Sequence, residues 1–197
     1  MTMMSSPASA VTAPSQAILE VAARLQEKTR PQVLDLGVLS DRTIQFFLSR
    51  GCRVFVEAAE DLRLARTAPA PDDGAAPPPI RLDYPDASFD GVLLWDVFDY
   101  LPDAVARAFA LEVTRVSRRD SFLLLYADTR RNPPAEPLQR WRLTEEGGVE
   151  HFQAGGAPQR RVYRENRDMV RLFPRHDVRR STLLRSQARE MLLHRVD

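Results

Sequence analysis

The apolar positions of the chain alternate between helical spacing and short continuous runs. Helical spacing predicts helices over residues 16–29, 40–51 and 102–116. Ser15 and Ser40 stand where the N-caps of the first two helices are expected. Continuous apolar runs bounded by polar or turn residues predict buried strands, at residues 33–36, 53–56, 89–95 and 122–126. Alternation of helices with buried strands is typical of an α/β fold with a mainly parallel sheet.

The end of the chain departs from this alternation. Residues 178–184 and 190–196 predict two strands joined by a turn at residues 186–188. Consecutive strands joined by a short turn form an antiparallel hairpin. We therefore expect a doubly wound, mainly parallel sheet of about seven strands that finishes in a C-terminal antiparallel hairpin.

Three segments carry neither pattern. Residues 1–14 are uncharged and rich in serine, alanine and proline, and we interpret them as a disordered N-terminal tail before a single domain over residues 15–197. Residues 67–79 are rich in alanine and proline, and because proline lacks a backbone N–H donor and fixes φ, they predict a surface loop. Residues 129–157 contain three prolines and several glycines and predict an irregular insert.

Composition bounds the kind of protein. A chain of 197 residues is long enough for one well-buried domain and too short for two ordinary ones. No apolar run approaches the ~20 residues that span a bilayer, and residues 1–14 lack the regions of a signal peptide. Cys52 is the single cysteine, and the three histidines have no metal-site spacing, so we predict no metal. We expect a cytoplasmic protein with no membrane or nucleic-acid partner.

Positive and negative charge lie in different parts of the chain. Residues 51–112 carry twelve acidic residues against five arginines, a balance of −7. Residues 160–197 carry eleven arginines against five acidic residues, a balance of +6. Two interpretations stay open: a genomic preference for arginine codons, or an interface in the arginine-rich C-terminal third that binds an acidic protein or a second copy of the chain. Guanidinium groups suit the second, because they bind carboxylate and phosphate in a bidentate way.

Two stretches of the chain resemble the class I S-adenosylmethionine-dependent methyltransferases. The run Val33-Leu34-Asp35-Leu36-Gly37, the helix after it and the strand that ends at Glu57 are similar to the family's first motif. In that motif a strand ends Asp-Leu-Gly-x-Gly-x-Gly, and the strand after the helix ends in an acid. The stretch SFDGVLLWDVFDYLPD at residues 88–103 is similar to the family's segment around the fourth strand. The resemblance covers most of the chain from Val33 onward and implies the class I methyltransferase fold.

The resemblance also implies a site for S-adenosylmethionine at the carboxyl ends of the first, second and fourth strands of that family. A glycine there lets the backbone approach the cofactor, and the acid after the second strand accepts hydrogen bonds from the ribose hydroxyls. The implied cofactor-binding residues are Asp35, Gly37, Glu57 and Asp96. The methyl acceptor would be a small molecule or a protein, shaped by residues 129–157. The catalytic residues stay unknown, because methyl transfer needs chiefly alignment; His151 is the one histidine that we consider as a general base.

The same residues also have structural interpretations. Asp35 and Glu57 could end buried strands without binding anything, and Asp96 could cap the following turn. Trp95 and Tyr100 could stack on adenine or on a substrate, or belong to the core.

The glycine motif is incomplete, and this keeps two functions open. The second and third glycines of the family fall on Leu39 and Asp41, where bare backbone usually faces the methionine end of the cofactor. A carboxylate close to the cofactor carboxylate costs on the order of 1–4 kcal/mol. One function is methyl transfer from a cofactor whose binding is weak or lost. The other is a catalytically inactive methyltransferase-like module that binds proteins.

Overall fold

Two β-sheets and the helices that cover them make up the part of the computed structural model that can be described, residues 11–57, 80–153 and 156–197. The larger sheet has six strands, in the spatial order β3 (Arg53–Val56), β2 (Gln32–Asp35), β4 (Phe89–Trp95), β5 (Ser117–Asp128), β9 (Ala188–Arg195) and β8 (His176–Leu183). Strands β3, β2, β4 and β5 run parallel, and β9 is antiparallel to both of its neighbours. The predicted C-terminal hairpin is therefore confirmed. The described ranges contain six strands of this sheet where about seven were expected, and the predicted loop at residues 67–79 lies outside those ranges.

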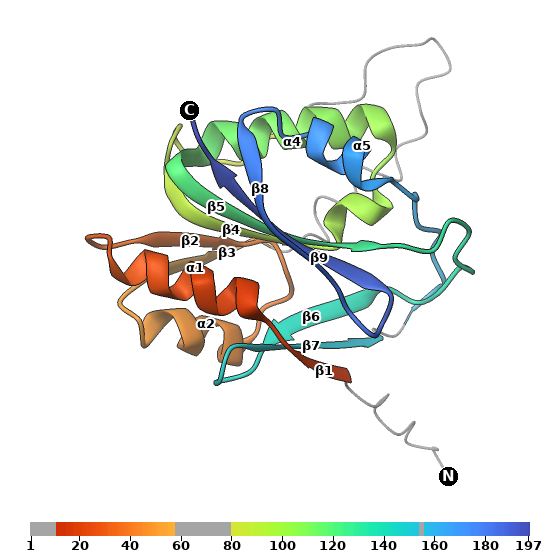
Figure 1. The fold of residues 1–197 in the computed structure, drawn as a ribbon, viewed down its shortest axis with the longest axis horizontal. Coiled ribbons are helices and arrows are strands. Elements are labelled where there is room, and N and C mark those ends of the chain that lie inside the picture. Colours follow the sequence, from red (N-terminus) through yellow and green to blue (C-terminus); the bar gives the residue numbers. More distant parts are fainter. Residues whose placement is uncertain (1–10, 58–79, 154–155) are drawn as a thin grey trace.

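Helices lie on both faces of the larger sheet, as the doubly wound prediction requires (Figure 1). They are α1 (Gln16–Gln26) and α2 (Asp41–Leu48) on one face, and α4 (Asp103–Val116) and α5 (Asn166–Arg171) on the other. The predicted N-caps are confirmed: Ser15 and Ser40 accept hydrogen bonds from the backbone N–H groups of Ile18 and Thr43, at 3.0 and 3.4 Å. None of the helices in the described ranges has the length and apolar character that a bilayer crossing requires.

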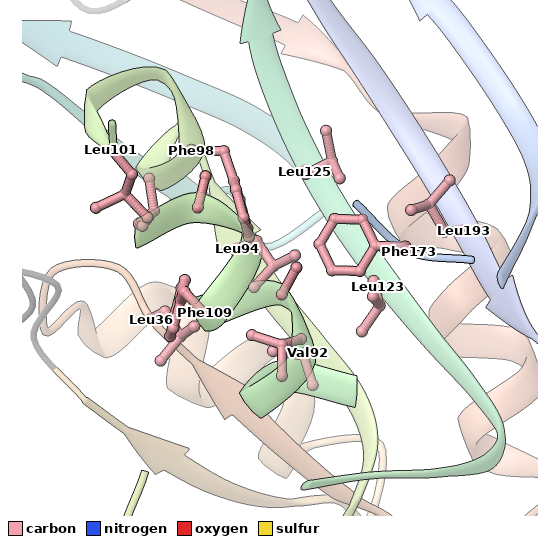
Figure 2. Packing of buried hydrophobic residues seen from close by; sticks show 14 of the residues in the cluster. Leu36, Val92, Leu94, Phe98, Leu101, Phe109, Leu123, Leu125, Phe173 and Leu193 are labelled. Carbon is pink, nitrogen blue, oxygen red and sulfur yellow. The ribbon is translucent and has the colours of Figure 1, made fainter. Parts of the chain in front are cut away.

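The central strand β4 is buried along its whole length because apolar layers cover both of its faces. Val92 and Leu94 point toward α4, where they pack with Phe109 and with Phe173 from the segment after α5 (Figure 2). Leu93 and Trp95 belong to the layer on the other face, beneath α1 and α2. Burial on both faces explains why the strand reads as a continuous apolar run in the sequence.

A smaller sheet of three strands corrects two predictions. Its order is β1 (Val11–Pro14), β7 (Gly148–Gln153) and β6 (Gln139–Leu143), with both pairs antiparallel. The disordered tail predicted over residues 1–14 was wrong for residues 11–14; residues 1–10 lie outside the described part. The irregular insert predicted over residues 129–157 was wrong for β6 and β7.

The physical reason lies in the side chains of the hairpin formed by β6 and β7. Trp141 and Leu143 are buried against the α1–α2 face of the larger sheet, whereas Arg142 between them pairs with Glu150 of β7 at 2.7 Å. Buried and charged side chains therefore alternate along β6, as expected for a strand with one face buried. The prolines of residues 133–137 precede the hairpin and do not interrupt it.

Candidate functional site

The carboxyl ends of the parallel strands bring the predicted site residues to one edge of the larger sheet. Asp35 ends β2, Trp95 ends β4 and Asp128 ends β5. Glu57, which follows β3, donates its backbone N–H to the carbonyl oxygen of Asp35 at 2.9 Å. This edge is where open parallel sheets bind ligands.

Asp35 is held by two hydrogen bonds inside the protein. Its Oδ1 atom accepts from the indole Nε1 of Trp95 at 2.6 Å and from the backbone N–H of Gly37 at 2.9 Å. The Asp35 residue is 1% exposed and Trp95 is 2% exposed. Trp95 has a φ of +48°, a left-handed conformation that is uncommon for a bulky residue and persists only where its surroundings hold it. The carboxylate that the resemblance implies for the cofactor therefore binds the protein's own indole.

Gly37 is a glycine for a reason that involves no ligand. A Cβ atom built there would overlap Nε1 and Cδ1 of Trp95 and would lie 2.9 Å from Oδ1 of Asp35. Trp95 therefore occupies the space that the missing side chain leaves open. Leu39, two residues further along the chain, is 74% exposed, so its side chain takes no part in this packing.

The indole of Trp95 is one layer of a buried aromatic stack made of Trp95, Tyr126 and Trp141. The ring centroids of Tyr126 and Trp141 are 4.4 Å apart, and Trp95 lies 5.9 Å from Tyr126 with an interplanar angle of 14°. The centroids of Trp95 and Trp141 are 6.4 Å apart, so all three rings contact one another, and the hydroxyl of Tyr126 donates to Oε2 of Glu190 at 2.6 Å, which fixes its ring. Of the two roles that the sequence left open for Trp95, the structure supports membership of the core.

Burial raises the pKa of Asp35 from 3.8 to about 6, although the bonds from Trp95 and Gly37 lower it. Because the folded chain holds this proton more tightly than the unfolded chain, folding stability falls as the pH rises from about 4 to about 6. Asp35→Asn keeps an Oδ1 acceptor for both bonds and removes the buried charge. We expect it to stabilise the fold by about 1–3 kcal/mol at pH 8 and to change little at pH 4.

Chemical denaturation at the two pH values measures this effect. Asp41→Asn is the matched control, because it removes an exposed carboxylate from the first turn of α2. It should destabilise the fold at pH 8 by about 0.3–1 kcal/mol. Equal effects of the two variants would contradict the assignment of a buried charge to Asp35.

The side chain of Asp96 also contacts other groups of the protein. It is buried at the start of the 3₁₀ helix η1 (Val97–Tyr100), where its side chain makes no capping hydrogen bond. Its Oδ2 atom accepts from the hydroxyl of Tyr100 at 3.3 Å and lies 3.8 Å from Nη2 of Arg161. The structure therefore places Asp96 at the predicted edge, in a charged cluster that the sequence did not indicate.

This cluster, which we call the Arg161 cluster, consists of Arg161 and the carboxylates of Asp96, Asp99 and Asp128. Nη1 of Arg161 lies 3.6 Å from Asp99 and 3.3 Å from Asp128, and its side chain is buried. Burial raises the pKa of Asp99 well above its ordinary value, and the nearby charge of Asp96 raises it further. The pKa of Asp128 is lowered in spite of its burial, because Arg130 donates hydrogen bonds to it. The sequence analysis missed this cluster, because its arginine and carboxylates lie far apart in the sequence and form no motif.

A small polar cavity of about 170 Å³ lies beside the Arg161 cluster. Trp141 and His151 form part of its wall, with ring centroids 4.8 Å apart, together with Arg130 and Arg161. Burial lowers the pKa of His151, and the charge of Arg161 lowers it further, so the imidazole is neutral at pH 7. The described residues contain no group of histidine, cysteine or acidic side chains placed to hold a metal ion.

The residues at this edge do not fit S-adenosylmethionine in the arrangement that the resemblance implies. The carboxylate of Asp35 and the bare face of Gly37 both contact Trp95, and Asp96 contacts Tyr100 and Arg161. Glu57 alone has the position implied for it, half-buried after β3 at the edge of the sheet. Three of the four implied ligands thus have structural roles.

Comparison with known proteins identifies the fold. No protein-family model and no curated protein matches the chain. A solved S-adenosylmethionine-dependent methyltransferase from Mesorhizobium loti is similar to it, with a TM-score of 0.53, 18% identity and coverage of 90% of this chain and 96% of that chain. A solved S-adenosylmethionine-dependent methyltransferase from Methanosarcina mazei is also similar, with a TM-score of 0.53, 15% identity and coverage of 86% of this chain and 94% of that chain. The chain has the fold of class I S-adenosylmethionine-dependent methyltransferases, as the resemblance implied.

Proposed function

We propose that this chain is a methyltransferase-like binding module that does not use S-adenosylmethionine. The single observation that carries the proposal is the indole of Trp95, which lies against Gly37 and bonds Asp35. The fold of a methyltransferase is kept, while Trp95 contacts Asp35 and Gly37, two of the residues that the resemblance implies for the cofactor.

An energetic argument supports this proposal. A ligand that contacts the bare face of Gly37 must first displace the Trp95 ring, which breaks a buried hydrogen bond of 2.6 Å and opens the aromatic stack. Loss of the packing of a buried tryptophan costs about 3–5 kcal/mol. That cost would weaken cofactor binding by roughly two to three and a half powers of ten.

Methyl transfer from S-adenosylmethionine to a small molecule or protein is the second candidate. The position of Glu57 after β3 favours it, because this carboxylate lies where the resemblance implies the ribose contact. The shared fold is compatible with it as well. In this case the cofactor would bind either after the Trp95 ring moves away or in a position that does not contact Gly37.

Titration calorimetry with S-adenosylhomocysteine separates the two candidates. We expect no binding at about 1 mM ligand. We also expect none for the Leu39→Gly, Asp41→Gly double variant, because Trp95 stays in place. Binding that Glu57→Ala weakens by about 1–3 kcal/mol would instead overturn the proposal and favour the second candidate. Glu27→Ala, which removes an exposed carboxylate after α1, is the matched control and should change nothing.

A further inference from the structure

A second, more open cavity of about 400 Å³ lies beyond the carboxyl end of β5, next to the segment that precedes α5. Four arginines contribute to its wall: Arg131, Arg164, Arg167 and Arg189. Glu165 is the one acidic residue in that wall. None of these residues belongs to the aromatic stack or to the Arg161 cluster.

The ion pairs around this cavity leave it positively charged. Glu165 is shared by Arg131 at 3.5 Å and Arg167 at 3.1 Å. Outside the wall, Asp103 pairs with Arg164 at 2.7 Å, and Asp168 lies 3.9 Å from Arg167 and 3.3 Å from Arg171. Five guanidinium groups against three carboxylates leave an excess of two positive charges.

The arginines of the wall differ in what they offer a ligand. The side chain of Arg164 is 5% exposed and donates to the carbonyl oxygens of Phe98 and Leu101 and to Asp103, so it contributes charge to the site but no free N–H donors. The side chains of Arg131 and Arg167 are 77% and 70% exposed, so their charged ends can move onto a ligand. Arg189 also lines the cavity; its Nη1 atom donates to Oγ of Ser181 at 3.4 Å, and its Nε atom is buried away from solvent.

We propose that this cavity is a binding site for a phosphate monoester. A phosphate monoester carries about −1.5 to −2 charges at pH 7 and offers three strong acceptor oxygens, which match an excess of two positive charges. A single carboxylate would neutralise only half of that excess. Guanidinium groups bind phosphate through parallel N–H donors, which gives the site its directional contacts. This site goes beyond the proposed function and does not depend on the state of the cofactor site.

Calorimetric titration of the full chain with phosphoserine tests the proposal. We expect a dissociation constant of roughly 10 μM to 1 mM and no binding of serine or glutamate in that range. Arg131→Gln combined with Arg167→Gln should weaken binding about tenfold or more, because two charged donors are lost. Their exposed side chains make the double variant safe for folding. The matched control is Arg24→Gln with Arg119→Gln, which removes two exposed positive charges, one from α1 and one from the start of β5, and should leave binding unchanged.

Two further probes distinguish the source of the phosphate. A phosphoserine peptide that binds more tightly than phosphoserine supports a protein ligand, and equal affinity supports a small phosphate monoester. No binding of any phosphate monoester at about 10 mM would overturn the proposal. Binding of inorganic phosphate alone would overturn it too, as would equal losses in the two double variants. Calorimetry with S-adenosylhomocysteine tests the proposed function separately, so the two can fail independently.

Discussion

Substitution of Arg161 by methionine should destabilise the fold by about 3–5 kcal/mol at pH 8. The guanidinium lies within 4 Å of Asp96, Asp99 and Asp128, and all three carboxylates are buried. Removing it leaves buried negative charges without their shared cation, which costs more than the lost contacts. Chemical denaturation of the two proteins measures the difference.

The pH dependence of this loss identifies its cause. Carboxylates without Arg161 bind protons more tightly in the folded chain, so acid relieves the repulsion and the destabilisation should be smaller at pH 5 than at pH 8. Asp99, whose pKa is already raised by burial, should contribute most to the change. Arg179→Met removes a half-exposed arginine 3.9 Å from Glu20 and should cost less than about 1 kcal/mol at both pH values. A loss in Arg161→Met that is independent of pH would contradict the electrostatic explanation.

Substitution of Gly37 by alanine should have an effect that depends on Trp95. In the parent chain the new Cβ would overlap the indole, and overpacking of this kind costs about 1–3 kcal/mol. Trp95→Ala alone should cost about 3–5 kcal/mol, because it empties one layer of the aromatic stack. In that background Gly37→Ala should cost clearly less, since the two indole atoms are gone and the close contact that remains is with Oδ1 of Asp35 at 2.9 Å.

A double-mutant cycle from denaturation curves measures this coupling. Trp95→Leu provides a second background with a smaller cavity, in case Trp95→Ala does not fold. Gly91→Ala is the matched control for the glycine change, because a Cβ there would make only ordinary contacts, at 3.7 Å or more. An equal cost of Gly37→Ala with and without the tryptophan would show that Trp95 is not the reason for glycine at this position.

The sequence was sufficient to predict the larger sheet because its signals are local. The apolar runs of β2, β3 and β4 lie within one or two residues of the observed strands, and Ser15 and Ser40 cap their helices as expected. Strands β1, β6 and β7 were missed, since β1 pairs with a strand more than a hundred residues away and β6 alternates arginine with apolar residues. Trp141, Leu143 and Val149 of β6 and β7 pack in the apolar layer that also contains residues of α1 and α2, a contact that no local pattern records.

The sequence predicted where the residues of the candidate site lie, but it did not predict what their side chains contact. Asp35, Gly37, Glu57 and Asp96 all lie at the carboxyl edge of the sheet, because strand ends fix their positions. Whether Asp35 serves a ligand or a side chain depends on Trp95, which is sixty residues away in the sequence. A sequence pattern fixes which residues end a strand, but only the packed structure decides which atoms their side chains meet.

Nuclear magnetic resonance of the tryptophan indoles tests the central claim most directly. The chain has two tryptophans, so ¹⁵N labelling gives two Nε1–H signals, and Trp141→Phe assigns the one from Trp95. With S-adenosylhomocysteine at about 1 mM, we expect the Trp95 signal to keep its position and its slow exchange with deuterated solvent, because the bond to Asp35 stays closed. A saturable shift of that signal together with faster exchange would contradict the account, since it would mean that the ligand opens the contact between Trp95 and Asp35.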